Sequence, residues 1–158
     1  MNPMLKPISL VLVSIIGIAF IVFAIQNEPE RTNLEFVESS FSGTITKVID
    51  GDTLDFRIMN GQNITIRLSL VDTPERNELG YEEATNFALT VCPVGIDAIY
   101  VQDTWQKVDK YGRSLGLVYC NDMLLNELLL SSEHAEITKY YCDKSEFGTE
   151  NWAIQYGC

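Results

Sequence analysis

Histidine and closely spaced cysteines are scarce in this sequence, which has one histidine among 158 residues and no two cysteines separated by two positions. Zinc sites are built mainly from these side chains, so a zinc site is a poor interpretation of the chain. Basic residues are also few, because 11 lysines and arginines stand against 22 aspartates and glutamates. This balance argues against a simple basic clamp for nucleic acid. The chain shows no internal repeat, and its length argues for one ordinary globular domain and against a two-domain enzyme.

An uncharged apolar run lies near the N-terminus, over residues 8–25. Its length is within the ~17–25 residues that a helix needs to cross a bilayer, so we expect a transmembrane or signal helix in residues 1–25. A buried core helix is the alternative, but the run has no polar face at helical spacing. Lys6 precedes the run and four glutamates follow it between positions 28 and 38, which leaves the N-terminus in the cytoplasm and the rest of the chain outside. Val22 and Ala24 form a possible cleavage site, so the chain is either membrane-anchored, which we favour, or secreted.

All four cysteines lie in the part of the chain expected outside the cytoplasm. An even number of cysteines in an exported domain favours two disulfides, for which three connectivities are possible. We expect Cys92 to pair with Cys120 and Cys142 with Cys158, because the second bond would hold a C-terminal tail that lacks its own core. Four buried free thiols are the alternative.

The remaining chain divides into a polar, acidic linker at residues 26–40 and one domain at residues 41–158. Alternating apolar residues and turn signals predict strands, and apolar stripes at helical spacing predict helices. The expected strands are 41–48, 53–58, 63–70, 96–103 and 114–120, and the expected helices are 80–92 and 123–130. This order fits a mainly β, α+β fold with a five-stranded OB-fold barrel, although the pattern alone also allows another α+β arrangement.

Three clusters place charged residues at tight turns. They are Asp50-Gly51-Asp52-Thr53, the segment from Arg67 to Glu75, and Asp109-Lys110-Tyr111-Gly112-Arg113. Each cluster also has a purely structural interpretation, as a common turn, a capped strand end or a hairpin loop. Because Asp72 directly follows an apolar run, we expect its carboxylate to be partly buried.

Together the clusters supply the parts needed for metal-assisted hydrolysis of a phosphodiester. Carboxylates from Asp52 and Asp72 suit a hard cation such as Ca²⁺, with water completing its coordination. Glu75 can orient or deprotonate a water, while Arg67 and Arg113 suit the oxygens of a phosphoryl group in the transition state. The side chains of Asn126 and Glu127, inside the leucine-rich helix, are expected to form internal hydrogen bonds and not to act in catalysis.

From about residue 41 to residue 141 the chain resembles the staphylococcal-nuclease-like, or thermonuclease, family. The resemblance rests on motifs that occur in the family's order: Val48-Ile-Asp-Gly-Asp-Thr53, Ile66-Arg-Leu-Ser-Leu-Val-Asp-Thr-Pro-Glu75, Asp109-Lys-Tyr-Gly-Arg113 and Leu125-Asn-Glu-Leu128. It implies a five-stranded OB barrel with helices and a Ca²⁺-dependent endonuclease that acts on DNA and RNA and leaves 3′-phosphates. We expect the catalytic domain to be a monomer.

The resemblance also implies roles for individual residues. The carboxylates matching Asp52 and Asp72 and the main-chain carbonyl matching Thr73 would hold calcium. Arg67, Glu75 and Arg113 match the catalytic positions, with Glu75 as the general base. Lys110 and Tyr111 match residues that contact the phosphate of the nucleotide, and Tyr141 matches an aromatic residue beside the base.

A non-catalytic OB-fold module that binds nucleic acid or protein at the cell surface is the competing hypothesis. We favour the enzyme, because a binding module has no physical need to crowd three carboxylates beside two guanidinium groups. The domain remains acidic, with 9 basic and 18 acidic residues from position 41 onward. Long-range attraction of a polyanion is therefore weak unless Ca²⁺ or salt screens the repulsion.

Overall fold

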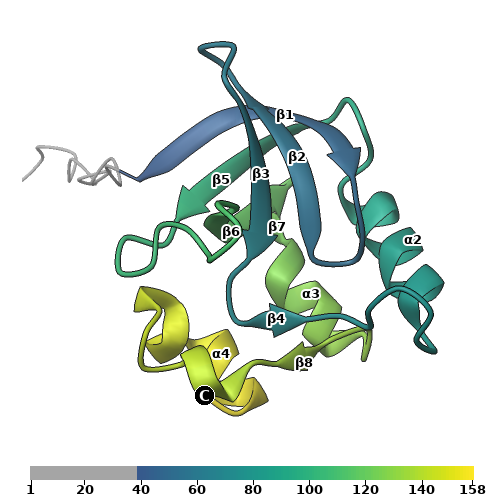
Figure 1. Ribbon diagram of the computed structural model, residues 1–158, viewed down its shortest axis with the longest axis vertical. Coiled ribbons are helices and arrows are strands. Elements are labelled where there is room, and N and C mark those ends of the chain that lie inside the picture. Colours follow the sequence, from purple (N-terminus) through teal and green to yellow (C-terminus); the bar gives the residue numbers. More distant parts are fainter. Residues whose placement is uncertain (1–38) are drawn as a thin grey trace, which may run out of the picture. The chain divides into compact units, whose positions relative to one another are not determined.

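Five strands close into a barrel in the computed structural model, which describes residues 39–158 (Figure 1). The strands are β1 (Ser40–Val48), β2 (Thr53–Ile58), β3 (Asn63–Leu68), β5 (Asp97–Gln102) and β6 (Ser114–Cys120). The pairs β1–β2, β2–β3, β1–β5 and β5–β6 are antiparallel, and parallel pairing of β3 with β6 closes the barrel. The chain therefore has an α+β fold with a closed five-stranded barrel, which agrees with the predicted OB-type architecture.

The predicted membrane segment at residues 8–25 and nearly all of the predicted linker lie outside the described residues. Within residues 39–158, no helix is long and apolar enough to cross a membrane.

Three α-helices accompany the barrel: α2 (Tyr81–Val91), α3 (Leu125–Ser131) and α4 (Asn151–Tyr156). The apolar stripe that predicted α2 faces the core, where Ala84, Ala88 and Val91 are buried. The predicted helix at residues 123–130 begins two residues later than expected, because Met123 and Leu124 form the short strand β7 against β6. Helix α4 was not predicted.

The C-terminal tail contributes to the main core, which corrects the expectation that it lacks one. It contains the 3₁₀ turns η1 (Lys139–Tyr141) and η2 (Glu146–Thr149) before α4. Phe147, Trp152 and Ala153 are buried in the same apolar cluster as the barrel strands. Both expected disulfides are confirmed: Cys92–Cys120 is fully buried, and Cys142–Cys158 joins the residue after η1 to the end of the chain.

The third predicted strand is shorter than expected because the chain turns before residue 70. Leu70 has φ 66°, a left-handed backbone conformation that a strand cannot continue through. After this turn, β4 (Val71–Asp72) runs in a different direction and pairs with β8 (Glu136–Ile137). The turn thus brings Asp72 back toward the end of β3, where Arg67 lies.

A buried amide holds this turn against the barrel. The Asn126 side chain accepts a hydrogen bond from the amide of Val118 and donates to the carbonyls of Ser69 and Gly116. This confirms the internal role predicted for Asn126, whereas the neighbouring Glu127 side chain makes no hydrogen bond within residues 39–158.

At Gly116 an added Cβ would lie 2.1 Å from the carbonyl oxygen of Val101, so only glycine allows β6 to approach β5 this closely.

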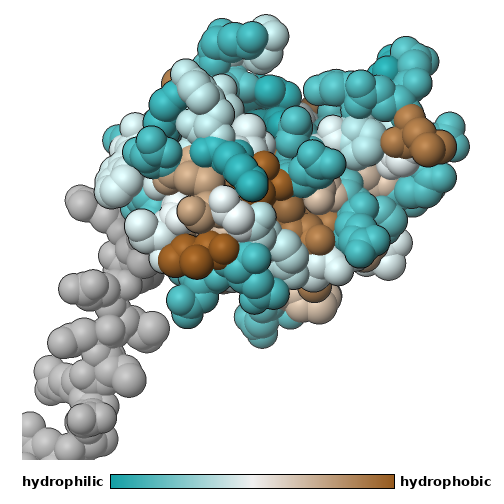
Figure 2. Space-filling view, turned by 90° about the horizontal axis from the view of Figure 1, so that it is seen from below, coloured by the Kyte–Doolittle hydropathy of each residue, from teal (hydrophilic) through white to brown (hydrophobic). Residues whose placement is uncertain are grey.

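The side of the domain seen in Figure 2, from below the view of Figure 1, carries hydrophobic residues in patches set among hydrophilic ones.

Candidate active site

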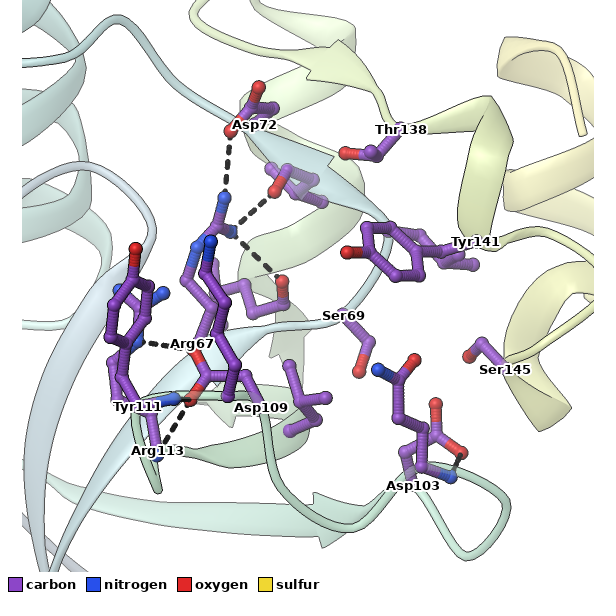
Figure 3. Close-up of a pocket in the computed structure, with 16 residues that line it drawn as sticks. Arg67, Ser69, Asp72, Asp103, Asp109, Tyr111, Arg113, Thr138, Tyr141 and Ser145 are labelled. Atoms are coloured by element: carbon purple, nitrogen blue, oxygen red, sulfur yellow. Dashed lines mark hydrogen bonds and ion pairs between the residues drawn. The ribbon is translucent and has the colours of Figure 1, made fainter.

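A pocket of about 390 Å³ opens where three parts of the chain meet (Figure 3). Residues 67–72 supply the turn between β3 and β4, and residues 103–115 supply the long connection between β5 and β6 with the start of β6. Thr138, Tyr141 and Ser145 supply the opposite side. The barrel therefore brings together the second and third charged clusters of the sequence and a C-terminal segment.

Arg67 is fixed by contacts on three sides. Its Nε lies 3.1 Å from Oδ1 of Asp52, and its Nη2 lies 2.8 Å from Oδ1 of Asp72. Its Nη1 donates to the carbonyl oxygens of Leu68 and Val71. With a side chain that is only 16% exposed, the guanidinium is held in one orientation at the edge of the pocket.

Asp52 lies behind Arg67 and is almost fully buried. One of its oxygens accepts hydrogen bonds from the amide and the hydroxyl of Thr73, at 2.8 and 2.9 Å, and the other accepts from the hydroxyl of Thr53. Burial and the negative charge of Asp52 raise the pKa of the nearby Asp50 carboxyl. Asp50 and Asp52 therefore place two negative charges close together at this turn.

Asp72 is more exposed than buried, although its carboxylate is partly shielded from water, as expected. Val71 and Asp72 alternate across the short strand β4, so Val71 faces the core and Asp72 faces outward with 58% of its side chain exposed. Partial burial raises the pKa of the Asp72 carboxyl, and the positive charge of Arg67 only partly offsets this rise. Its carboxylate can still reach a ligand in solution.

The carboxylates of Asp52 and Asp72 are the groups of this site that could hold a hydrated divalent cation. Both lie beside the same guanidinium, Asp52 at Nε and Asp72 at Nη2, and Thr73 is tied directly to Asp52. Oxygen ligands of this kind suit Ca²⁺, which completes its coordination with water. Among residues 39–158 there is no group of three or more histidine, cysteine, aspartate or glutamate side chains arranged to hold a metal.

Arg113 is held by the loop that carries it. Its Nε lies 2.7 Å from Oδ2 of Asp109, and its Nη1 donates to the hydroxyl of Thr53 at 3.3 Å. Oδ1 of Asp109 also accepts the amides of Tyr111 and Arg113, both at 2.9 Å. Burial opposes ionisation of Asp109, but these hydrogen bonds outweigh it and lower the pKa of the carboxyl. Asp109 is therefore a positioning residue for Arg113, a role not predicted from the sequence, although an aspartate that begins a turn with glycine commonly accepts hydrogen bonds from the turn's own amides.

The residues matched to substrate binding all line the pocket. The ammonium of Lys110 lies 4.8 Å from the centre of the Tyr111 ring, and the guanidinium of Arg113 lies 5.4 Å from it. Tyr141 lies on the opposite side of the pocket (Figure 3). Six of the nine predicted calcium, catalytic and substrate residues line the pocket, namely Arg67, Asp72, Lys110, Tyr111, Arg113 and Tyr141.

Glu75 does not line the pocket. It follows Asp72 on the connection to α2 with an exposed side chain, and its backbone amide donates to the carboxylate of Glu78 at 2.8 Å. The Glu75 carboxylate makes no hydrogen bond or ion pair within the described part of the chain, so it is free to contact water.

Two pocket residues had no signal in the sequence. Ser69 is buried, and its hydroxyl has no hydrogen-bond partner among residues 39–158. Asp103 is also buried, and its Oδ1 accepts the amides of Trp105, Gln106 and Glu146, which ties the β5–β6 connection to η2. Asp103 accepts two amides of its own turn, but its contact with Glu146 and the burial of Ser69 come from distant segments, which a local pattern does not report.

Comparisons of the sequence with known proteins identify its family. A sequence model of the family described as "Staphylococcal nuclease homologue" matches residues 65–153, more than half of the chain.

A micrococcal nuclease of Shigella flexneri is 35% identical over 85 residues, covering 51% of this chain and 44% of the relative. Endonuclease YncB of Bacillus subtilis (strain 168) is 32% identical over 111 residues, covering 62% of this chain and 48% of the relative. An uncharacterized protein of Bacillus anthracis is 37% identical over 102 residues, covering 60% of this chain and 46% of the relative. The chain thus spans about half the length of these relatives.

Proposed function

The chain belongs to the staphylococcal nuclease family, and on this basis we propose that it is a Ca²⁺-dependent endonuclease that cleaves DNA and RNA to leave 3′-phosphates. The observation that carries the proposal is the convergence of Arg67, Lys110 and Arg113 on one pocket, next to the Asp52–Asp72 pair. Three cationic side chains beside two carboxylates suit a phosphodiester and a cation at the same time.

We assign calcium to Asp52, Asp72 and the main-chain carbonyl of Thr73. The bound ion would supply a positive charge that draws in the phosphodiester and stabilises charge developing on it.

The protein's own cations bind the substrate in this proposal. Lys110 and Tyr111 contact a phosphate of the nucleotide, and Tyr141 lies beside the base. Arg67 and Arg113 donate hydrogen bonds to the non-bridging oxygens of the reacting phosphate. Because both guanidinium groups are already oriented by carboxylates, little reorganisation is needed when negative charge increases in the transition state.

Glu75 is assigned as the general base. A water forms a bond to phosphorus while Glu75 accepts its proton, the bond from phosphorus to the 5′-oxygen breaks, and a proton is returned to that oxygen. The phosphate therefore remains on the 3′ side. The free, exposed carboxylate of Glu75 supports this role, since no other group of the described chain competes for it.

The test is digestion of plasmid DNA, and of a single-stranded RNA, by the full chain with Ca²⁺ or with a chelator. We expect cleavage with Ca²⁺ and none with chelator, and about a 10²–10³-fold or larger loss of kcat in Glu75→Gln and in Arg113→Ala. Glu82→Gln is the matched control, because Glu82 is exposed in the first turn of α2, and it should cleave at the normal rate. Full activity in either site variant would remove the role assigned to that residue. Binding without cleavage or a Ca²⁺ requirement would support the non-catalytic module instead.

We also propose that the domain acts outside the cytoplasm, anchored through residues 8–25 or secreted after cleavage. Two disulfides within the domain support this location, since such bonds persist in oxidising compartments. Protease treatment of intact cells that express a C-terminally tagged chain should remove the tag. Protection of the tag until the cells are lysed would contradict the proposal.

A further inference from the structure

The exposed aromatic side chains of the described domain lie on two segments that contribute residues to the pocket, and two of them, Tyr111 and Tyr141, line it themselves. Within residues 39–158 they are Trp105, Tyr111, Tyr140 and Tyr141, which are 65%, 72%, 70% and 39% exposed. All four belong to two segments, residues 103–113 and residues 138–145, which we call the pocket walls because both contribute lining residues. Figure 3 shows Tyr111 and Tyr141 on opposite sides of the pocket. Exposed aromatic rings are therefore a property of this one region.

The basic residues gather there too, in a domain that is acidic elsewhere. The pocket walls contain Lys107, Lys110, Arg113, Lys139 and Lys144 and only three acidic residues. The other described residues include four basic and fifteen acidic ones. None of the four lysines forms an ion pair with another residue of the described domain. The walls thus offer unpaired positive charge next to flat apolar rings, which is the combination found in sites for single-stranded nucleic acid.

Trp105 differs from the three tyrosines because its ring is free. Lys110 and Arg113 lie over Tyr111, and Lys144 lies over Tyr140 and Tyr141, which also contact each other. Among residues 39–158, no aromatic or cationic side chain covers the Trp105 indole. A large apolar ring left in water has most to gain from a flat partner.

The backbone holds Trp105 in place beside the pocket. Its amide donates to Asp103 at 3.0 Å, and the flanking residues Asp103 and Gln106 both line the pocket. The preceding residue, Thr104, donates its amide to the carboxylate of Glu146. The indole is therefore presented from a fixed loop.

We infer that Trp105 is a substrate-binding residue outside the pocket, and that its indole stacks on an unpaired base next to the nucleotide held in the pocket. This inference rests on the proposed function and adds one binding position to it. A base in a duplex already has both faces covered by its neighbours, so only an unpaired base can stack on the indole. The unpaired lysines contact the phosphates along the strand and explain how an acidic domain holds a polyanion.

The test is the binding of a 12-nucleotide single-stranded DNA of mixed sequence, with Ca²⁺ present, to the full chain carrying Glu75→Gln to block cleavage. The chain has two tryptophans, and Trp152 is buried, so quenching of tryptophan emission that survives Trp152→Phe reports contact with Trp105. We expect quenching by the single strand. Trp105→Ala should raise its Kd about 5- to 150-fold, the range measured for loss of one stacked base, and Trp105→Phe should restore part of the affinity.

Several controls make the result specific. Met59→Ala removes another exposed apolar side chain, on the turn between β2 and β3, and should bind normally. A mononucleotide, which fills only the pocket, should bind Trp105→Ala as well as the parent. The duplex of the same sequence should bind more weakly than the single strand and lose no affinity in Trp105→Ala.

The inference is overturned if Trp105→Ala binds the single strand normally, if its affinity for the duplex falls equally, or if an acidic peptide displaces the strand and depends on Trp105 in the same way. Its failure is distinct from failure of the proposed function. Quenching and tight binding without cleavage by the parent chain would contradict the nuclease and leave the stacking site intact. Normal cleavage with no effect of Trp105 would do the reverse.

Discussion

Asp52 and Asp72 contact the same guanidinium but differ in burial, so replacing each one should separate folding from calcium binding. The Asp52 side chain is 7% exposed and its partner Arg67 is 16% exposed. Asp52→Asn leaves the largely buried Arg67 with only the exposed Asp72 as an ionic partner and removes a charged acceptor from Thr73. We expect the free energy of unfolding to fall by about 3 kcal/mol, at the lower end for breaking a buried ion pair. Asp72 is 58% exposed, and Asp72→Asn should cost at most about 1 kcal/mol.

The assay is urea unfolding in chelator, followed by fluorescence. With an m-value of about 2 kcal/mol/M, the midpoint should fall by about 1.5 M for Asp52→Asn and by no more than about 0.5 M for Asp72→Asn. Calcium at 100 times its Kd should stabilise the parent chain by about 2.7 kcal/mol, and both variants should lose most of this gain. Asp122→Asn makes the same substitution at an exposed turn between β6 and β7 and should change neither quantity.

Equal midpoint shifts for Asp52→Asn and Asp72→Asn in chelator would refute the reasoning from burial. Undiminished stabilisation by calcium in one variant would remove that carboxylate from the metal site.

Three further outcomes are expected. Because hydrogen bonds with Arg113 hold the pKa of Asp109 below 3.8, its ionised form stabilises the native state above that pH and the stabilisation is lost as pH falls through the lower native pKa. Unfolding curves should therefore show Asp109→Asn less stable by about 1 kcal/mol at pH 7, with the difference shrinking below pH 3.8. Burial raises the pKa of Tyr100 to about 12, so the phenol ionises first in the unfolded chain and the free energy of unfolding should fall as pH rises above 10. Tyr100→Phe should have a shallower alkaline slope in urea titrations between pH 9 and 11, where Tyr119, whose pKa burial also raises, still contributes. Replacing both Cys142 and Cys158 by serine removes a disulfide that closes a 16-residue loop, and the free energy of unfolding should fall by about 3 kcal/mol. Mononucleotide binding should also weaken, because Tyr141 directly precedes Cys142. An unchanged affinity in calorimetry would show that the disulfide does not position the site.

Local patterns predicted most strands well. The bounds of β2 and β6 agree with the prediction, since alternation of apolar residues between turn signals lies within a few positions of the chain. The prediction failed at Leu70, where the apolar pattern continues but the backbone turns left-handed. It also missed α4, whose buried residues Trp152 and Ala153 pack on partners far away in sequence.

The sequence by itself predicted the barrel class and the charged residues at the turns, because turn residues and alternating strands are local features. It left three cysteine pairings open, and the structure contains the expected one. Only the tertiary structure decided how these parts are used. Arg67 serves both carboxylates because the turn at Leu70 reverses the chain, and Asp72 is exposed because Val71 takes the inward position on β4. The basic and aromatic residues of the two pocket walls are far apart in the sequence. They form one surface because pairing of β3 with β6 and the hydrogen bonds of Asp103 bring both segments to the same pocket.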